Sequence, residues 1–190
     1  MTARSLVFLV ALCAASSACA SAGDERKAEA EAVQKESTVA ELLRKAEASV
    51  SVGDTTRAEE YYASALKAGA DPHLVVSKLL VVCVADQRFP AAIEYAEQYL
   101  YRRPNDWEIA FAAASLHAAV GEHPRARELL EQVLRQKPEL AEAHYTLASV
   151  LRSEGDDLEL ADQHDLAYLK LNPSGPFAET ARARLSREVR

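Results

Sequence analysis

The stretch WEIAFAAASLHAAVGEHPRARELLEQVLRQKPEL, residues 107–140, decides the fold of this chain. Its first part is rich in alanine and runs to Gly121, a residue type that suits a left-handed helix end. Its second part places Ala126 and Leu130 one helical turn apart, so that they share a face. Pro138 then prevents the helix from continuing. The stretch therefore predicts two helices joined by a tight turn.

The same pattern recurs along the chain with a period of 34 residues, which becomes 35 once near the end. The recurring alanines are Ala58, Ala92, Ala126 and Ala161; the turn positions are Gly53, Gln87, Gly121 and Gly155; the prolines are Pro104, Pro138 and Pro173. A fixed period of this length is typical of stacked helical hairpins. Aromatic residues make up only 6% of the chain while alanine is abundant, and this composition favours closely packed helices. We therefore predict an all-α fold.

The N-terminal residues predict export. Arg4 precedes a short apolar run over residues 6–15, and small residues follow it. This order is typical of a secretory signal peptide, which we place at residues 1–18, and the run is too short to span a bilayer. The segment also resembles a bacterial lipobox, which implies that Cys19 carries lipid. The alternative is an ordinary signal peptidase that cuts shortly after Cys19 and leaves a soluble periplasmic or secreted protein.

Lipidation of Cys19 would give a stable membrane anchor, because several acyl chains would be attached. Ala20 and Ser21 follow the cysteine in place of an aspartate. By the sorting rule of Gram-negative lipoproteins, this implies the outer membrane, facing the periplasm. Residues 19–36 form a tether in this interpretation, since they contain almost no large apolar side chain. Cys83 stands among leucines and valines, and we expect it to be buried.

The recurring pattern resembles the tetratricopeptide repeat. The family pattern asks for a small residue late in the first helix, a glycine at the turn, then alanine, a large residue and proline. Residues 107–140 supply these as Ala114, Gly121, Ala126, Leu130 and Pro138. The resemblance implies a right-handed solenoid of antiparallel helix pairs over residues 37–175. The predicted repeats are at about residues 39–72, 73–106, 107–140 and 141–175, followed by a capping helix over 176–190.

Two further predictions concern helix ends. Asn105, with Glu108 three residues later, predicts a capping box where the helix of residues 107–119 begins. Near the C-terminus, Arg182 and Arg184 belong to a series of arginines. The simplest interpretation is that the dipole of a helix favours cations at its C-terminal end. Attraction of an anionic partner is the alternative.

In the tetratricopeptide family the first helices of successive repeats line a concave groove. Carried over to this chain, the groove positions are Leu43, Arg44 and Glu47; Leu74, Lys78 and Val81; Phe111 and Ser115; and Tyr145, Ser149 and Arg152. None of them is an asparagine, so the lysine–asparagine clamp by which chaperone-tail binders of the family hold a carboxylate is not expected. A face of mixed apolar and small residues implies an amphipathic helix or an extended peptide as partner. The alternative is that Val81 and Phe111 only pack against neighbouring residues.

Catalysis and nucleic-acid binding find little support in the sequence. The five histidines do not form a metal-binding motif such as H-E-x-x-H, and no glycine-rich phosphate loop or nucleophile elbow occurs. We predict no enzyme activity, no cofactor and no metal. The remaining alternative is a metal-binding or hydrolytic site that uses His117 and His144. A formal net charge of −7 without a basic stripe is unlike that of a nucleic-acid binder.

These features together predict a scaffold for protein–protein interaction, exported and lipid-anchored, that acts as an adaptor or assembly factor for an envelope complex. A narrower alternative is a pilotin-like role in the assembly of a secretin ring or a type IV pilus. Pilotins of that kind are also tetratricopeptide lipoproteins. The sequence predicts a protein or peptide partner without identifying it.

Overall fold

The computed structural model describes residues 27, 31, 34, 35, 38–155 and 157–186. Within these residues all regular secondary structure is helical and no strand occurs, which confirms the all-α prediction. The chain divides into two compact units, residues 1–70 and residues 71–190. The predicted signal peptide, Cys19 and most of the predicted tether lie outside the described residues. Among the helices that are described, none combines the length and the apolar composition that crossing a bilayer requires.

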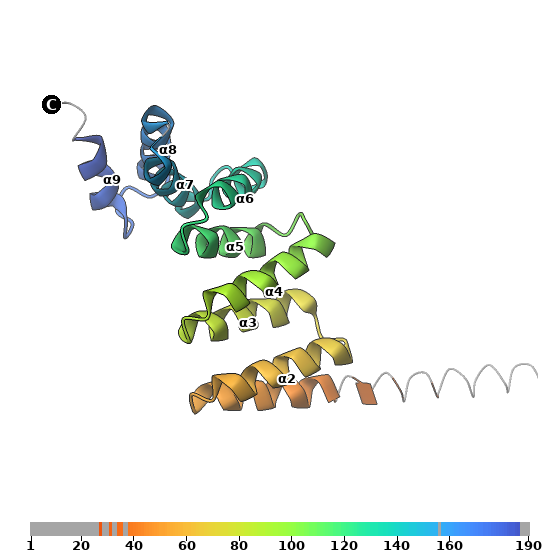
Figure 1. Cartoon of the computed structure of the whole chain (residues 1–190). Helices are drawn as coiled ribbons and strands as arrows, with labels where there is room; N and C mark the ends of the chain where they lie inside the picture. The colour runs from red at the N-terminus through yellow and green to blue at the C-terminus, as the bar shows by residue number, and fades with distance from the viewer. Residues whose placement is uncertain (1–26, 28–30, 32–33, 36–37, 156, 187–190) are drawn as a thin grey trace, which may run out of the picture. The chain divides into compact units, whose positions relative to one another are not determined.

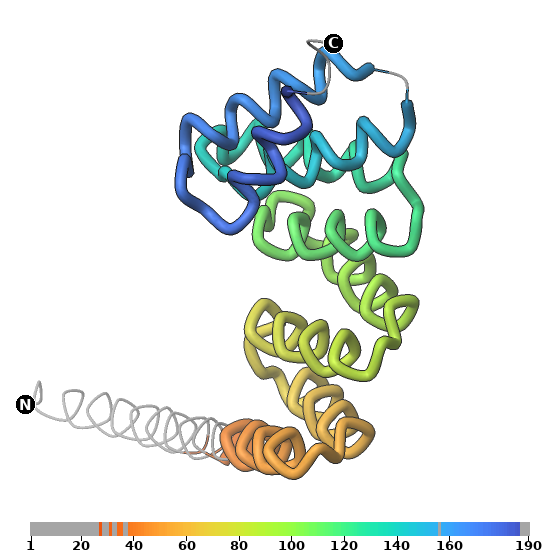
Figure 2. The backbone as a smooth tube through the Cα atoms, turned by 90° about the vertical axis from the view of Figure 1, so that its left-hand side faces the viewer, coloured from red at the N-terminus to blue at the C-terminus, as the bar shows by residue number. Residues whose placement is uncertain are grey.

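The first unit contains a helix over residues 38–51 and α2, Thr55–Ala68, which lie side by side in Figures 1 and 2. Asp54 begins α2, because its side chain accepts a hydrogen bond from the backbone N–H of Arg57 at 3.1 Å. The helices bury mainly small residues and one tyrosine: Ala46, Ser49, Ala58, Tyr62 and Ala65.

The second unit is a run of antiparallel helices connected by short turns (Figure 1). Its elements are α3, Pro72–Ala85; α4, Phe89–Arg102; α5, Trp107–Ala119; α6, His123–Gln136; α7, Ala141–Glu154; α8, Leu158–Leu171; and α9, Ala178–Leu185. Each of these helices packs against the next one, and α5 also packs against α7. The first helices of two successive hairpins, α5 and α7, are therefore neighbours. Side chains at equivalent positions of these two helices can thus share one surface.

The turn inside each hairpin uses a left-handed backbone conformation. The φ angle is +75° at Gly53, +84° at Gly121 and +74° at Gly155. Gln87 stands at the equivalent position and also has a positive φ, +58°. A residue with a side chain is strained there, whereas glycine is not. The stacking of the hairpins thus imposes this conformation even where the local sequence does not favour it.

The predicted cap of α5 is wrong by one residue. The N-cap is Asp106, whose Oδ1 accepts a hydrogen bond from the backbone N–H of Ile109 at 3.3 Å. Asn105 is exposed and precedes the helix. Glu108 does not close a capping box with Asn105 but makes an ion pair with His73 on α3, at 2.9 Å. An aspartate reaches the same donors as asparagine and adds a charge that the helix dipole favours.

Small buried residues hold the second unit together. Ala92, Ala126 and Ala161, the recurring alanines, are fully buried in one apolar cluster that also contains Leu130. A methyl group at these positions lets neighbouring helices approach closely while still excluding water. Cys83 belongs to the same cluster and is fully buried, which confirms the position expected for it.

The last helix, α9, is shorter than the predicted capping helix over 176–190. It follows a connection of residues 172–177 and packs against α8. Its buried residues are Ala178 and Ala181, which form a second apolar cluster with Tyr168. Residues 187–190 lie outside the described residues.

Candidate functional site

The α3 helix is apolar on two opposite faces. One face is buried and contributes Val75, Val76, Leu79, Leu80, Val82 and Cys83 to the interior. On the other face Leu74 is 43% exposed and Val81 is 65% exposed, with the exposed Lys78 between them. These three predicted groove positions follow one another at steps of four and three residues and share a side of the helix. Packing in the interior uses the opposite face of α3, so these two apolar side chains remain exposed.

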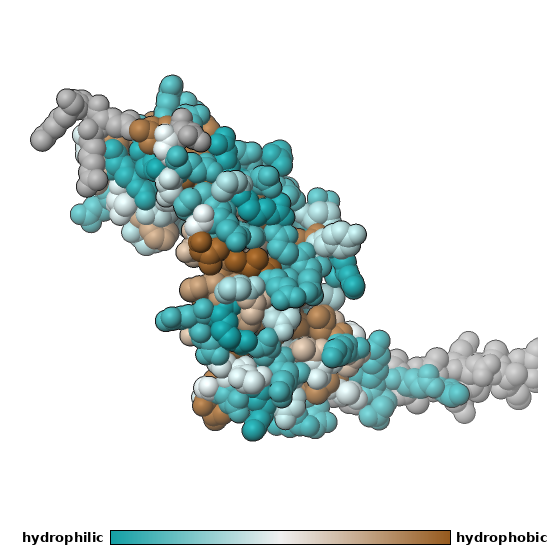
Figure 3. All heavy atoms as spheres, viewed as in Figure 1, coloured by the Kyte–Doolittle hydropathy of each residue, from teal (hydrophilic) through white to brown (hydrophobic). Residues whose placement is uncertain are grey.

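The α5 helix continues this surface with smaller side chains. Phe111 and Ser115, the predicted groove positions, are half-buried, while Ala119 is exposed. Phe111 packs against the apolar cluster of the interior, so it serves the core as well as the surface. The hydroxyl of Ser115 donates to the carbonyl of Phe111 at 2.9 Å. On the face drawn in Figure 3, apolar side chains gather around α4 and α5.

The outer helix α6 shows the pattern of a helix without such a surface. Its buried side chains are Ala126, Leu129, Leu130 and Val133, on one stripe. Arg125 and Arg135 are exposed on the remainder of the helix. A single apolar stripe is the ordinary pattern of a helix that packs on one side only. The exposed apolar side chains of α3 are therefore not a feature of every helix in the unit.

The predicted groove positions of the first unit form a polar surface. Leu43 is half-buried, and Arg44 and Glu47 are exposed on the helix over residues 38–51. On the same helix Lys45 pairs with Glu41 at 2.8 Å. This ion pair raises the pKa of Lys45 and lowers the pKa of Glu41. The helix therefore presents mostly charged groups, in contrast to α3.

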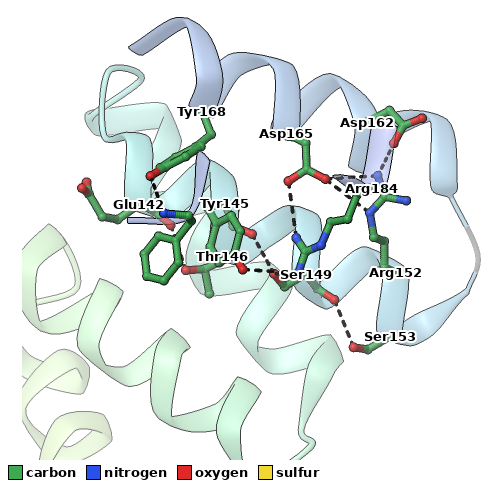
Figure 4. Close-up of polar contacts among 11 residues, drawn as sticks. Glu142, Tyr145, Thr146, Ser149, Arg152, Ser153, Asp162, Asp165, Tyr168 and Arg184 are labelled. Atoms are coloured by element: carbon green, nitrogen blue, oxygen red, sulfur yellow. Dashed lines mark hydrogen bonds and ion pairs between the residues drawn. The ribbon is translucent and has the colours of Figure 1, made fainter. Parts of the chain in front are cut away.

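Two of the three predicted groove positions on α7, Tyr145 and Ser149, contact Arg184 of α9 (Figure 4). The ring of Tyr145 stacks on Phe177, the residue before α9, with 4.2 Å between ring centroids and 11° between planes. The guanidinium of Arg184 lies 4.8 Å from the centroid of the Tyr145 ring and donates a hydrogen bond to the hydroxyl of Ser149 at 3.1 Å. Arg152, the third predicted position, points to α8 and contacts Asp162 and Asp165. Tyr145 and Ser149 thus lie under the C-terminal segment, whereas Arg152 faces α8.

A fully buried carboxylate, Asp165, lies at the centre of these contacts. Arg152 of α7 donates to Asp165 at 3.1 Å, and Arg184 of α9 donates to it at 3.4 Å. Burial raises the pKa of the Asp165 carboxyl, and hydrogen bonding and charge from the two guanidinium groups oppose this rise. Sequence reasoning missed this residue. The signal that could have found it is its register: Asp165 follows Leu130 by the 35-residue step and so stands where the repeat places a large apolar side chain.

A second polar cluster joins the N-terminal ends of α3 and α5. His73 contacts Asp106 through Nδ1 at 2.7 Å and Glu108 through Nε2 at 2.9 Å. The hydroxyl of Tyr99 also donates to Asp106. The hydrogen bond to Asp106 raises the pKa of His73, partly offset by burial. Burial and the bond to Asp106 raise the pKa of Tyr99 to about 12.

In the part of the chain that the structure describes, the residues of this cluster that could together hold a metal ion are His73, Asp106 and Glu108, with ligand atoms within 4.8 Å of one another. In the observed arrangement the two carboxylates contact different nitrogens of the imidazole ring. One ion can use only one of these nitrogens. The arrangement is that of a protonated imidazole that donates two hydrogen bonds, and it links the two helices.

The two histidines of the alternative metal site contact different partners. His117 is buried and lies between Glu97, at 3.0 Å, and Glu122, at 2.6 Å. His144 instead contacts His164 on α8, with 2.8 Å between their Nδ1 atoms. Each pair connects neighbouring helices. This arrangement gives a structural role to both histidines and offers no common site for them.

Comparisons with known proteins agree with this architecture. Two family models, both described as tetratricopeptide repeat, match residues 43–106 and residues 83–150, and together they span more than half of the chain. No curated protein sequence matches the chain.

Among solved structures, the chain is similar to a tetratricopeptide repeat protein from Parabacteroides merdae, with a TM-score of 0.70 and 23% identity over 78% of this chain and 59% of that one. It is similar to YrrB, a TPR protein with an unusual peptide-binding site, with a TM-score of 0.63 and 21% identity over 73% and 71%. It is also similar to MamA from Desulfovibrio magneticus RS-1, with a TM-score of 0.67 and 15% identity over 79% and 92%. Identities this low show a common fold and nothing further. On the matched repeats and this fold, the chain belongs to the tetratricopeptide repeat proteins.

Proposed function

We propose that the chain is a non-catalytic scaffold that binds an apolar segment of a partner protein on the exposed face of α3 and the adjoining surface of α5. The observation that carries this proposal is the exposure of Leu74 and Val81 on a helix whose opposite face already fills the interior. Large apolar side chains that cluster on a surface mark sites of protein interaction. Val84, on α3 as well, is 41% exposed and extends the surface toward the C-terminal end of the helix.

The shape of the surface suits an amphipathic helix or an extended peptide. Leu74 and Val81 project from α3, while Ser115 and Ala119 leave the surface of α5 low because their side chains are small. A ligand helix can place its apolar residues on such a stripe at steps of three and four. YrrB, which shares the fold, is a TPR protein with a peptide-binding site, and this supports the same class of ligand by analogy only.

The location that we propose is the outer membrane, facing the periplasm, with the chain anchored through lipid on Cys19. Its support is the order of basic, apolar and small residues before Cys19 in the sequence. A scaffold held there would act as an adaptor or assembly factor for an envelope protein complex. Capture of a secretin or of a type IV pilus protein would specify the narrower pilotin-like role.

The binding surface is tested by capture from detergent-solubilised envelopes with two matched variants. Val81→Asp places a charge on α3, whereas Val52→Asp places the same charge on another exposed valine, in the turn before α2. Neither change affects a buried side chain. We expect the wild type and Val52→Asp to retain the same cross-linked partner and Val81→Asp to lose it. Equal recovery with all three chains would overturn the proposed surface.

The anchor is tested separately by metabolic labelling with palmitate. We expect the wild-type chain to incorporate the label and Cys19→Ala to incorporate none. The Cys83→Ala chain is the matched control, because Cys83 is buried in the apolar cluster and should not affect lipidation. An unlabelled wild-type chain recovered from the soluble periplasmic fraction would show that an ordinary signal peptidase removes the leader.

A further inference from the structure

The C-terminal helix covers the part of the inner surface that α7 contributes. Phe177 stacks on Tyr145. Arg184 lies over the same ring and donates a hydrogen bond to Ser149 (Figure 4). Ser149 follows Val81 by two periods of 34 residues, so the two residues occupy the same repeat position. Val81 is exposed on α3, while Ser149 is half-buried and accepts a hydrogen bond from α9. The same position of the repeat is thus open in one hairpin and filled in another.

The contacts around Arg184 recognise a guanidinium group in three ways. The buried carboxylate of Asp165 accepts from Nη1 at 3.4 Å. The hydroxyl of Ser149 accepts from Nη2 at 3.1 Å, and the face of the Tyr145 ring lies 4.8 Å from the central carbon. A carboxylate, a hydroxyl and an aromatic face around one planar cation form a site selective for arginine.

The aromatic contact adds a second element of recognition. Phe177 precedes Arg184 by seven residues, about two helical turns, which places both side chains toward the same surface. The backbone N–H of Phe177 also donates to the hydroxyl of Tyr168 at 3.1 Å. The α7 surface therefore fits a short helical segment with an aromatic residue at its start and an arginine two turns later.

The α9 helix, which packs on α8, buries little apolar surface. The helix has eight residues, and the side chains that it buries completely or nearly so are those of Ala178 and Ala181. A helix of this length is not stable by itself in water, so its structure depends on docking. Short segments with little buried apolar surface open first in local unfolding. When α9 leaves, Asp165 loses one of its two guanidinium partners, and the vacated site favours another arginine.

We propose that the α7 surface is a binding site for a partner's helical segment that carries an aromatic residue and, seven positions later, an arginine, and that α9 occupies this site in cis. The partner segment and α9 then compete for Tyr145, Ser149 and Asp165. This inference rests on the proposed scaffold function and extends the binding surface from α3 and α5 to α7.

The test uses the full chain and a labelled synthetic peptide, SGPFAETARARLSREVR, that copies residues 174–190. In the chain, Arg184→Glu removes the cis guanidinium. Arg182→Glu is the matched control, because Arg182 is exposed and its guanidinium donates to the carbonyl of Pro173 at 2.5 Å and not to α7. We expect the Arg184→Glu chain to bind the peptide at least about tenfold more tightly than the Arg182→Glu chain, since the competing helix has an effective concentration in the mM range. The measurement is fluorescence anisotropy, with amide shift changes at Tyr145 and Ser149 as the local signal.

A second peptide tests the chemistry of recognition. The same peptide with alanine in place of Arg184 should bind the Arg184→Glu chain at least about tenfold more weakly, because the charge-assisted contacts are lost. Equal binding of the two peptides would overturn the proposal, as would a folded Arg184→Glu chain that binds neither.

The milder Arg184→Ala chain replaces Arg184→Glu if the latter does not fold. Loss of folding in both variants would show that α9 cannot be displaced and would also overturn the proposal. Adding Val81→Asp should leave peptide binding to the Arg184→Glu chain unchanged. A failure of the proposed α3 surface is therefore distinguishable from a failure at α7.

Discussion

The α3 and α7 helices are first helices of their hairpins, yet their inner surfaces differ. On α3, Leu74 and Val81 are exposed. On α7, Tyr145 and Ser149 lie under α9, and Arg152 is paired with two carboxylates. The repeat fixes where these side chains stand. Whether they are open to a partner depends on which residues the chain places there and on the segment that comes after the last hairpin.

The two helices should differ most in how much stability is lost when a basic side chain at a predicted groove position is removed. Arg152→Ala should lower the free energy of unfolding by about 3 kcal/mol, because it leaves the buried carboxylate of Asp165 with one guanidinium partner. Lys78→Ala removes the predicted groove cation of α3, whose side chain is exposed, and should change the free energy of unfolding by less than about 0.5 kcal/mol. Urea unfolding followed by circular dichroism measures both. Equal effects of the two substitutions would remove the distinction between an open and a filled surface.

Substitutions of buried alanines in the interior should lower the stability by similar amounts on different helices. Ala92→Leu on α4 and Ala126→Leu on α6 should each lower the free energy of unfolding by about 2 kcal/mol, because both alanines are fully buried where a larger side chain forces helices apart. Ala119→Leu is the control, since Ala119 is exposed on α5. Thermal or urea unfolding of the three variants gives the comparison. A neutral Ala126→Leu chain would mean that the hairpins are not held by close contacts at this position.

Phe111 is intermediate between the exposed groove positions of α3 and the covered positions of α7, because its side chain is half-buried. Phe111→Ala should lower the free energy of unfolding by about 1.5 kcal/mol, less than a fully buried phenylalanine would, because Phe111 is half-buried against the apolar cluster. It should also weaken capture of a partner on the surface of α3 and α5. Unfolding and capture are measured on the same preparation. A normal stability with lost capture would place Phe111 entirely on the binding surface, and a loss of about 4 kcal/mol would place it in the core.

The smallest expected effects come from two histidines with opposite pH dependence. The pKa of His73 is raised above 6.5, mainly by its bond to Asp106, so its stabilising contribution is complete below pH 6.5 and is lost as the pH rises through the raised pKa. The pKa of His164 is lowered, first by burial and then by the charge of His144. Its contribution is complete above pH 6.5 and is lost as the pH falls through the lowered pKa.

Urea midpoints measured between about pH 5 and pH 9 check this pair. We expect His73→Gln to flatten the alkaline side of the stability profile and His164→Gln to flatten the acidic side. The His73 effect belongs to the contact between α3 and α5, and the His164 effect to the contact between α7 and α8. If His164→Gln altered the alkaline side instead, the environment assigned to that residue would be incorrect.

Much of the fold was predictable because the repeat pattern consists of residue types that determine the local backbone conformation. Glycine at the turn and proline after the second helix each fix a boundary by their own backbone chemistry. Gln87 shows the limit of this reasoning, since its left-handed conformation follows from the stacked hairpins and not from its side chain. The helix starts were less predictable. Asn105 and Asp106 are both good capping residues, and the choice between them depends on where α5 meets α3 and α4.

The candidate site was predictable only as a set of positions. The period places Val81, Ser115 and Ser149 at equivalent points of three first helices, and the structure shows them to differ in exposure. The sequence alone explains the C-terminal arginines by the helix dipole. This explanation does not predict that Arg184 contacts Asp165 and Tyr145. No local sequence pattern predicts these contacts, because they join residues on three different helices.

The period of 34 residues, with its alanines and turn glycines, determined by itself that the chain forms tetratricopeptide hairpins, because helix propensity, apolar periodicity and chain breakers act over a few residues. The tertiary structure decided which surfaces remain open. The buried Asp165 pairs with one arginine from α7 and one from α9, and the last helix contacts part of α7 while Leu74 and Val81 on α3 stay exposed. Such an outcome depends on desolvation and charge pairing across distant segments, which no stretch of sequence contains on its own.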